Sequence, residues 1–182
     1  MIAVQQIRAA VDAYLGCHPG DAGQIATLIN ALADPGDLAS RTTFTGHVTC
    51  SAIVLDPGGH VLHIRHNALD RWLCPGGHLD LADSSLVGAA LREVSEETGI
   101  DVRALALVDE MPIDIDVHPI PANPARGEPG HQHFDLRYAF RAVTRPEICL
   151  QRDEVHDFAW LPAAEIRPAI LAQRIAAAAA SL

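Results

Sequence analysis

The sequence predicts an α+β fold, and three observations support this prediction. Apolar residues recur at helical spacing near both ends of the chain, and apolar and polar residues alternate through its middle. Between the alternating segments, an acid-rich helical pattern follows a glycine-rich turn. The length of 182 residues fits one globular unit. We expect a domain over 44–182 and, over 1–43, a helical extension packed on it.

The N-terminal extension has the pattern of a helical hairpin. Two apolar stripes flank the segment 18–21, a His-Pro-Gly-Asp turn, and they consist of Val4, Ile7, Val11 and Tyr14, and of Ile25, Leu28, Ile29 and Leu32. The segment 34–36, Asp-Pro-Gly, is expected to end the second helix. These apolar stripes are expected to pack either on the domain or on a second subunit. The sequence does not choose between the two, so a homodimer is one of the alternatives.

The first half of the domain predicts a hairpin, a turn and a helix. Strands are expected over 47–55 and 61–66, joined by the turn 56–59, with a short strand at 72–74. The Pro75-Gly76-Gly77 turn follows, where missing side chains let the backbone approach a ligand. A helix is then expected from about Ser85 to Thr98, ended by Gly99.

The second half predicts two long strands, 105–118 and 131–141, separated by the Pro- and Gly-rich loop 119–130. Alternation places His131, His133, Asp135 and Arg137 on one face of the second strand, and Asp114, Asp116 and His118 on one face of the first. An ordinary solvent-facing sheet would also explain these faces. Asp is a poor strand former, which favours a functional surface. A short strand at 158–161, a helix start at 162–166 and a terminal helix at 170–180 complete the chain.

Charge and composition exclude several classes of protein. The net charge of −10 argues against binding to nucleic acid. No apolar run approaches the roughly 18–20 residues of a membrane span, and no signal-peptide pattern begins the chain, so we expect a soluble cytoplasmic protein without membrane contact. The four cysteines lack C-x-x-C spacing, so free thiols are expected instead of a zinc site or a disulfide framework.

The acid-rich helix is the candidate functional site. Glu93, Glu96 and Glu97 are spaced so that their carboxylates converge on nearly one face of the helix. Like charges at this spacing are unfavourable, and a hard divalent cation such as Mg²⁺ or Mn²⁺ would reverse that cost. A solvated acidic face is the alternative.

The segment 77–100 resembles the box of the Nudix hydrolase family, G-x5-E-x7-R-E-U-x-E-E-x-G-U, where U is a bulky aliphatic residue. The second half matches through Arg92, Glu93, Val94, Glu96, Glu97, Gly99 and Ile100. The first half departs from the pattern, because Asp83 replaces the first Glu and because eight residues, not seven, separate Asp83 from Arg92. Asp83 or Ser84 could instead cap the helix.

The resemblance implies a Nudix-type α/β/α sandwich and a metal-dependent hydrolase that cleaves the pyrophosphate bond of a nucleoside diphosphate linked to another moiety. It further implies that Glu93 and Glu97 bind Mg²⁺ (or Mn²⁺), that Glu96 does so directly or through water, and that Gly76 supplies a backbone oxygen. Arg92 is expected to orient the acids by pairing with Glu96 or Asp83.

The resemblance implies a general base either from the box or from a loop far along the chain, and substrate contacts outside the box. Glu154 is the first candidate for the base and Glu128 the second. Five residues of the two polar faces are the candidates for substrate binding: His118, His131, His133, Asp135 and Arg137. The three histidines could contact a phosphate, bind a second metal, or pack at a strand surface.

Two other functions are open within the same fold. One is an enzyme similar to isopentenyl-diphosphate isomerase, for which Cys74 would serve; the other is a non-catalytic module that senses a nucleotide. The intact R-E-x-x-E-E pattern favours hydrolysis. The residues that would recognise a particular substrate are not indicated by the sequence.

Overall fold

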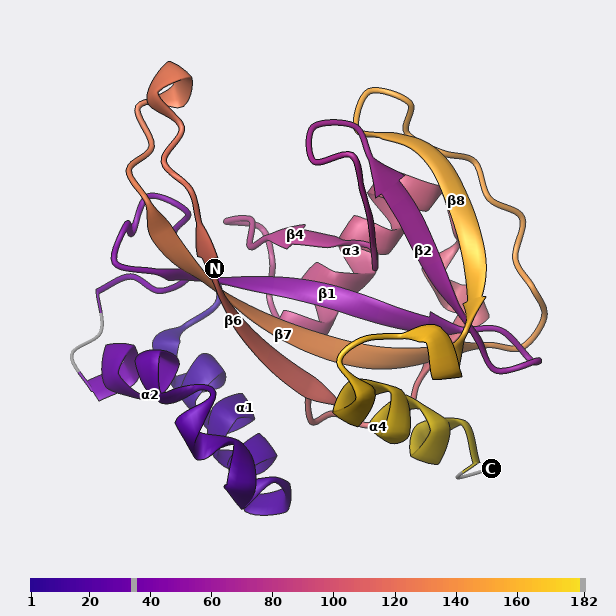
Figure 1. The fold of residues 1–182 in the computed structure, drawn as a ribbon, viewed down its shortest axis with the longest axis horizontal. Coiled ribbons are helices and arrows are strands. Elements are labelled where there is room, and N and C mark those ends of the chain that lie inside the picture. The colour runs from indigo at the N-terminus through magenta and orange to yellow at the C-terminus, as the bar shows by residue number, and fades with distance from the viewer. Residues whose placement is uncertain (34–35, 181–182) are drawn as a thin grey trace.

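A mixed sheet of eight strands forms the centre of the molecule, a computed structural model that describes residues 1–33 and 36–180 (Figure 1). The central strand β1 (His47–Leu55) pairs in parallel with β7 (His131–Ala142) and antiparallel with β2 (His60–His66) and β4 (Gly76–His78). The remaining strands pair with β7 or β2, namely β5 (Leu105–Leu107) and β6 (Asp114–Ile120) with β7, and β3 (Arg71–Leu73) and β8 (Val155–Pro162) with β2.

Alternation along β1 divides the hydrophobic core between the two faces of the sheet. Val48 and Val54 belong to one core cluster, together with buried residues of α3 (Leu86–Thr98). Ile53 and Leu55 belong to a second cluster with residues of α4 (Ala169–Ala180). Since neighbouring side chains of a strand point to opposite faces, the helices lie on both sides of the sheet. The expected α/β/α arrangement is confirmed.

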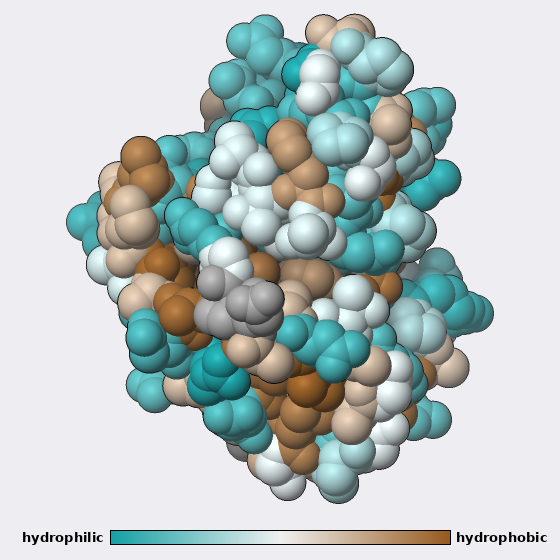
Figure 2. Space-filling view, turned by 90° about the vertical axis from the view of Figure 1, so that its left-hand side faces the viewer, coloured by the Kyte–Doolittle hydropathy of each residue, from teal (hydrophilic) through white to brown (hydrophobic). Residues whose placement is uncertain are grey.

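The N-terminal segment forms a helical hairpin, as expected. It consists of α1 (Val4–Cys17), a short 3₁₀ helix (Pro19–Gly23) and α2 (Ala26–Ala33). Its apolar stripes are buried in the same cluster as α3 and the apolar face of β7, so this chain covers them itself. Figure 2 views this side of the molecule, with polar side chains above, where the β6–β7 loop projects, and apolar patches gathered below. The expected helix stop at 34–35 lies outside the described residues.

The helix α3 begins and ends with strong capping signals. The Ser85 side chain accepts a hydrogen bond from the backbone N of Gly88 at 3.0 Å. Ser85 is therefore the N-cap, and the expectation of Asp83 or Ser84 in that role is wrong. Gly99 ends the helix in the left-handed conformation, with φ of 67°, which glycine adopts without strain.

Three local predictions are corrected by the structure. The Gly76-Gly77 segment is a short strand, β4, that pairs with β1 rather than a turn. The expected strand 105–118 is two strands, since Asp109 accepts from the backbone N of Met111 at 2.9 Å in a turn and Pro112 has no N–H to donate. The segment 162–166 forms only a 3₁₀ turn (Ala163–Glu165).

The other predicted strands and the terminal helix are present, with β8 extended at both ends. Among the described helices, none combines the length and the apolar character needed to cross a lipid bilayer.

Candidate active site

The acids of α3 lie against the glycines of β4. The backbone N of Gly76 donates a hydrogen bond to Oε2 of Glu97 at 3.0 Å. A Cβ atom on Gly77 would lie 2.6 Å from Oε1 of Glu93. A side chain at Gly77 would displace the Glu93 carboxylate, and a Cβ on Gly76 would lie 2.7 Å from the backbone O of Cys50, so both positions have room only for glycine. Val94, fully buried and between Glu93 and Glu97 in the chain, anchors α3 to the core.

Arg92 holds the acid cluster together. Its guanidinium donates to Asp83 through Nε and Nη2, both at 3.1 Å, and through Nη1 to Glu93 at 2.9 Å and Glu96 at 2.8 Å. Nη2 also donates to the backbone O of His78 at 2.8 Å, which ties α3 to β4. Arg92 was expected to pair with Glu96 or Asp83; it pairs with both, and it also donates to Glu93, its neighbour in the chain.

Burial makes two acids of α3, Glu93 and Glu97, reluctant to ionise. The Glu97 side chain is only 3% exposed, and burial, together with the charges of Glu93, Glu154 and Glu96, raises its pKa to about 8. Burial also raises the pKa of Glu93, against the opposing effect of Arg92. Three carboxylates thus share one guanidinium, and no cation among the described residues pairs with Glu97. Within the described residues, the carboxyl groups of the cluster outnumber the one guanidinium that pairs with them.

The two candidate bases lie in different places. Glu154 is exposed in the turn before β8, and its charge acts on Glu93 and Glu97, which places it beside the acid cluster. Glu128 lies in the β6–β7 loop, 3.7 Å from Arg41, and its charge acts on His47. Of the two candidates, only Glu154 is among the charges that raise the pKa of Glu93 and Glu97.

The two predicted polar faces lie side by side, as the alternation indicated. The register pairs His118 with His133, Asp116 with Asp135, and Asp114 with Arg137. Asp135 is buried and accepts hydrogen bonds from Thr49, Ser51 and Arg137. Arg137 donates to Asp114 and Asp116 as well, at 3.0 and 2.9 Å. These groups saturate one another, which leaves the histidines as the polar groups of this face with unused atoms.

Sequence reasoning missed two histidines that complete this face. His47 pairs directly with His133, and His78 pairs with Thr49, two residues further along β1. The five imidazoles of His47, His78, His118, His131 and His133, here called the imidazole cluster, stand with neighbouring ring centroids 4.7–5.7 Å apart. The alternation of 47–55 would have placed His47 on the polar face of its strand; only the pairing of β4 with β1 brings in His78.

Cys74, the residue that an isomerase-like activity would use, is partly enclosed. Its Sγ lies 3.8 Å from Nε2 of His63, and burial raises the pKa of the thiol to about 12, although Arg137 opposes this. The thiol is therefore protonated at neutral pH.

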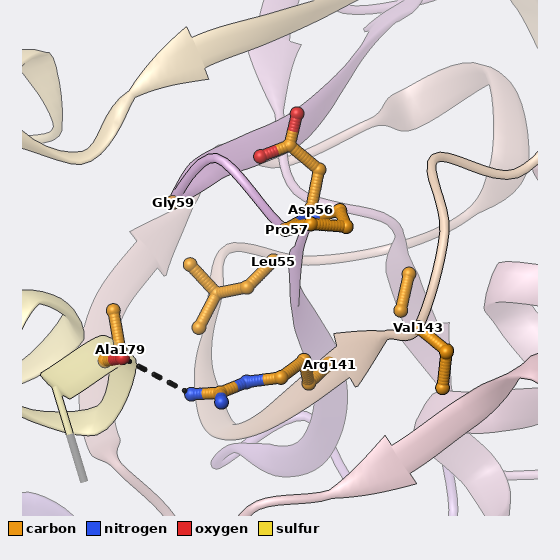
Figure 3. A pocket seen from close by; sticks show the side chains of 8 residues that line it. Leu55, Asp56, Pro57, Gly59, Arg141, Val143 and Ala179 are labelled. Atoms are coloured by element: carbon orange, nitrogen blue, oxygen red, sulfur yellow. Dashed lines mark hydrogen bonds between the residues drawn. The ribbon is translucent and has the colours of Figure 1, made fainter. Parts of the chain in front are cut away.

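A pocket of about 380 Å³ lies at the far end of β1 from the imidazole cluster (Figure 3). Leu55 and Arg141 line it, and Arg141 donates to the backbone O of Ala178 at 2.9 Å, at the end of α4. Neither the acids of α3 nor the histidines line this pocket.

The family model of the NUDIX domain matches residues 45–181, three quarters of the chain. The chain belongs to the Nudix family. A curated relative, a probable DHNTP pyrophosphohydrolase of Lactococcus lactis, is 36% identical over 75 residues, which are 41% of this Nudix chain and 42% of the relative. The match thus spans less than half the length of that relative.

Solved structures share the Nudix fold at low identity. An Ap4A hydrolase of C. elegans has a TM-score of 0.56 at 16% identity, with 74% of this chain and 98% of that chain covered. The dihydroneopterin triphosphate pyrophosphohydrolase of E. coli has a TM-score of 0.55 at 22% identity, with coverages of 70% and 91%. At such identities the likeness establishes the fold alone.

Proposed function

We propose that this Nudix protein is a Mg²⁺- or Mn²⁺-dependent pyrophosphohydrolase that cleaves the phosphoric anhydride bond of a nucleoside diphosphate linked to another moiety. The observation that supports it most directly is the buried acid pair, Glu93 and Glu97, packed on the two glycines of β4, with Arg92 bound to Glu93. This arrangement costs stability unless a cation is bound, which is why a purely structural role would not favour it.

The acid cluster fits a hard divalent cation. Its donors are carboxylate oxygens, the ligands that Mg²⁺ and Mn²⁺ prefer. Burial and the neighbouring carboxylates raise the pKa of Glu97, and a bound cation would offset both effects. Glu93 and Glu97 would hold the ion, with Glu96 as a direct or water-mediated ligand and the backbone oxygen of Gly76 as a further one. When bound, the ion supplies positive charge that offsets the repulsion between phosphate oxygens and an attacking water.

The side chains around the acids would position them and remove a proton. Arg92, with five hydrogen bonds to four partners, fixes the directions of Glu93 and Glu96. Glu154 is our candidate for the general base, because its charge already acts on both buried acids. Glu128 is the second candidate.

The polar face of β6 and β7 would contact the rest of the substrate. Asp135 and Arg137 are engaged with neighbouring side chains, so we assign them a positioning role and assign the contacts to His118, His131 and His133. No observation favours the isomerase-like alternative, since the Cys74 thiol stays protonated at neutral pH.

The deciding experiment is a substrate panel of nucleotide derivatives with Mg²⁺, in which release of phosphate, pyrophosphate and monophosphate is measured. We expect a monophosphate product from at least one nucleoside diphosphate derivative. Glu93→Gln and Glu97→Gln should abolish turnover while the fold stays intact, whereas Glu165→Gln, a charge change far along the chain, should not. Near-normal kinetics in folded Glu93→Gln or Glu97→Gln at saturating Mg²⁺ would remove the assignment.

The base has its own test. Glu154→Gln should lower kcat by about 10²–10⁴-fold, the usual span of general-base catalysis. A decrease of less than about tenfold would move the assignment to Glu128, for which Glu128→Gln is the matching variant.

A further inference from the structure

The imidazole cluster contains three histidines whose ligand atoms converge. His47 of β1, His78 of β4 and His133 of β7 each offer a ring nitrogen, and these nitrogens lie within 4.8 Å of one another. A tetrahedral ion with Zn–N distances of about 2.0–2.1 Å needs nitrogens about 3.3–3.4 Å apart. Small rotations of the three rings would close that difference. Because three paired strands carry the residues, the backbone already holds the donors on one face.

Two of the ring nitrogens are buried without a partner. Nε2 of His47 and Nε2 of His133 have no hydrogen-bond partner within the described part of the chain. The His47 ring is 1% exposed, and its Nδ1 lies 3.2 Å from the backbone O of Thr43. A carbonyl only accepts, so Nδ1 carries the proton and Nε2 presents its lone pair to the cluster. An unsatisfied buried lone pair is costly, which is why a ligand is expected there.

The three rings are enclosed by the protein, since His47 is buried and His78 and His133 are partly buried. Neutral imidazole is the form that binds metals, and enclosure away from water favours that form. The nearby cation Arg41 is partly offset by Glu128, 3.7 Å away.

We propose that His47, His78 and His133 bind one zinc-type transition-metal ion, at a site separate from the acids of α3. Imidazole nitrogens suit Zn²⁺ and its transition-metal neighbours, whereas Mg²⁺ takes oxygen ligands. The hydrogen bond from His47 to Thr43 orients that ligand, as hydrogen bonds behind metal-binding histidines commonly do. Three protein ligands leave a fourth position for water or an anionic oxygen.

The proposed zinc site is structurally joined to the acid cluster. His78 follows Gly76 and Gly77 on β4, and its backbone O accepts from Arg92 at 2.8 Å. Its side chain faces the imidazoles while its backbone supports the acids. The zinc proposal does not rest on the proposed hydrolysis, because its test measures metal binding.

The test uses the full chain, from which metal is first removed with a chelator. Co²⁺, the spectroscopic substitute for zinc, is then titrated into the protein in the presence of excess Mg²⁺. We expect one equivalent of Co²⁺ with the absorption of a tetrahedral ion. His78→Ala and His133→Ala should each weaken binding at least about 100-fold, a loss no smaller than that from removing a supporting group behind a ligand. His156→Ala, an exposed histidine on β8, should bind like the wild type.

The acid site provides the decisive comparison. The double variant Glu93→Gln/Glu97→Gln should keep its equivalent of tetrahedral Co²⁺. Loss of binding in this variant with retention in folded His78→Ala and His133→Ala would overturn the proposal, and so would absence of binding by the wild type in excess Mg²⁺. Circular dichroism checks the fold of each variant. Should both histidine variants fail to fold, a zinc anomalous peak between the three rings in wild-type crystals decides for the proposal, and its absence against it.

Discussion

Replacing Glu97 by Gln should stabilise the metal-free protein while it abolishes hydrolysis. Glu97 is 3% exposed, and its pKa of about 8 compares with an ordinary value of 4.5. Between these two values the native state keeps a proton at Glu97 that the unfolded chain has released. The free energy of unfolding therefore falls as the pH rises from about 4.5 to about 8, and the ionised carboxylate is the destabilising form above that range.

The size of the effect follows from the same two pKa values. Each pH unit between them corresponds to about 1.4 kcal/mol, which sets a ceiling of about 5 kcal/mol at pH 8 or above. Since the ionised carboxylate can move toward water, we expect Glu97→Gln to recover about 2–4 kcal/mol at pH 8. The amide oxygen of Gln can still accept the hydrogen bond from Gly76, so this contact is kept.

Urea unfolding in EDTA at pH 5 to pH 8.5 measures this difference. The wild type should lose stability across the range and Glu97→Gln should not, so that the two curves separate toward high pH. Glu96→Gln is the matched control, because its side chain is 56% exposed and its replacement relieves no buried charge. Adding Mg²⁺ at pH 8 should restore the wild type and leave Glu97→Gln unchanged. Parallel pH profiles for wild type and Glu97→Gln would refute the reasoning.

Three further predictions concern the support of the site and of the fold. Gly77→Ala should cost less than about 1 kcal/mol of stability, because its Cβ meets the flexible end of Glu93, but it should lower kcat about 10²-fold. Gly76→Ala should destabilise the fold by about 2–3 kcal/mol, since its Cβ would lie 2.7 Å from the backbone O of Cys50. Urea unfolding measures the stability of each variant, and initial rates measure its kcat. Arg92→Lys should reduce kcat/KM about 10–100-fold with the fold retained, because an ammonium cannot reproduce the contacts to three carboxylates; wild-type kinetics would contradict this. Arg174→Met should destabilise by about 3 kcal/mol in urea, because Arg174 is 10% exposed and pairs with Asp21 and Asp114, while Arg103→Met, whose pair with Asp101 is exposed, should not change the urea midpoint.

Local patterns predicted the elements whose stability is local. The stripes of α1 and α2, the alternation of β1 and β7 and the Gly99 cap all lie within one short segment, and each is present in the structure. The break between β5 and β6 was missed because apolar residues continue across it; Pro112 and the turn at Asp109 ended the pairing instead.

The candidate site was predictable to the extent that it lies on one helix. The spacing of Glu93 and Glu97 predicted that their carboxylates lie on nearly one face of the helix, and in the structure both lie against the glycines of β4. The contribution of β4 could not be derived in the same way, because it depends on the pairing of His78 with Thr49 across a gap of 29 positions in the chain. For the same reason the sequence indicated His118, His131 and His133 but not the group of His47, His78 and His133.

The departures from the Nudix box illustrate how a helix tolerates change at its start. The additional residue lies before Ser85, which caps α3, so the spacing of Arg92, Glu93 and Glu97 within the helix is untouched. Asp83 stands outside the helix and is 7% exposed, with its two oxygens bound to Nε and Nη2 of Arg92 and Oδ2 also bound to the backbone N of Asp80 at 2.7 Å. The shorter carboxylate is thereby committed to Arg92. Asp83 therefore pairs with Arg92, while Glu97 has no cationic partner among the described residues; under the proposed function the bound metal ion would be that partner.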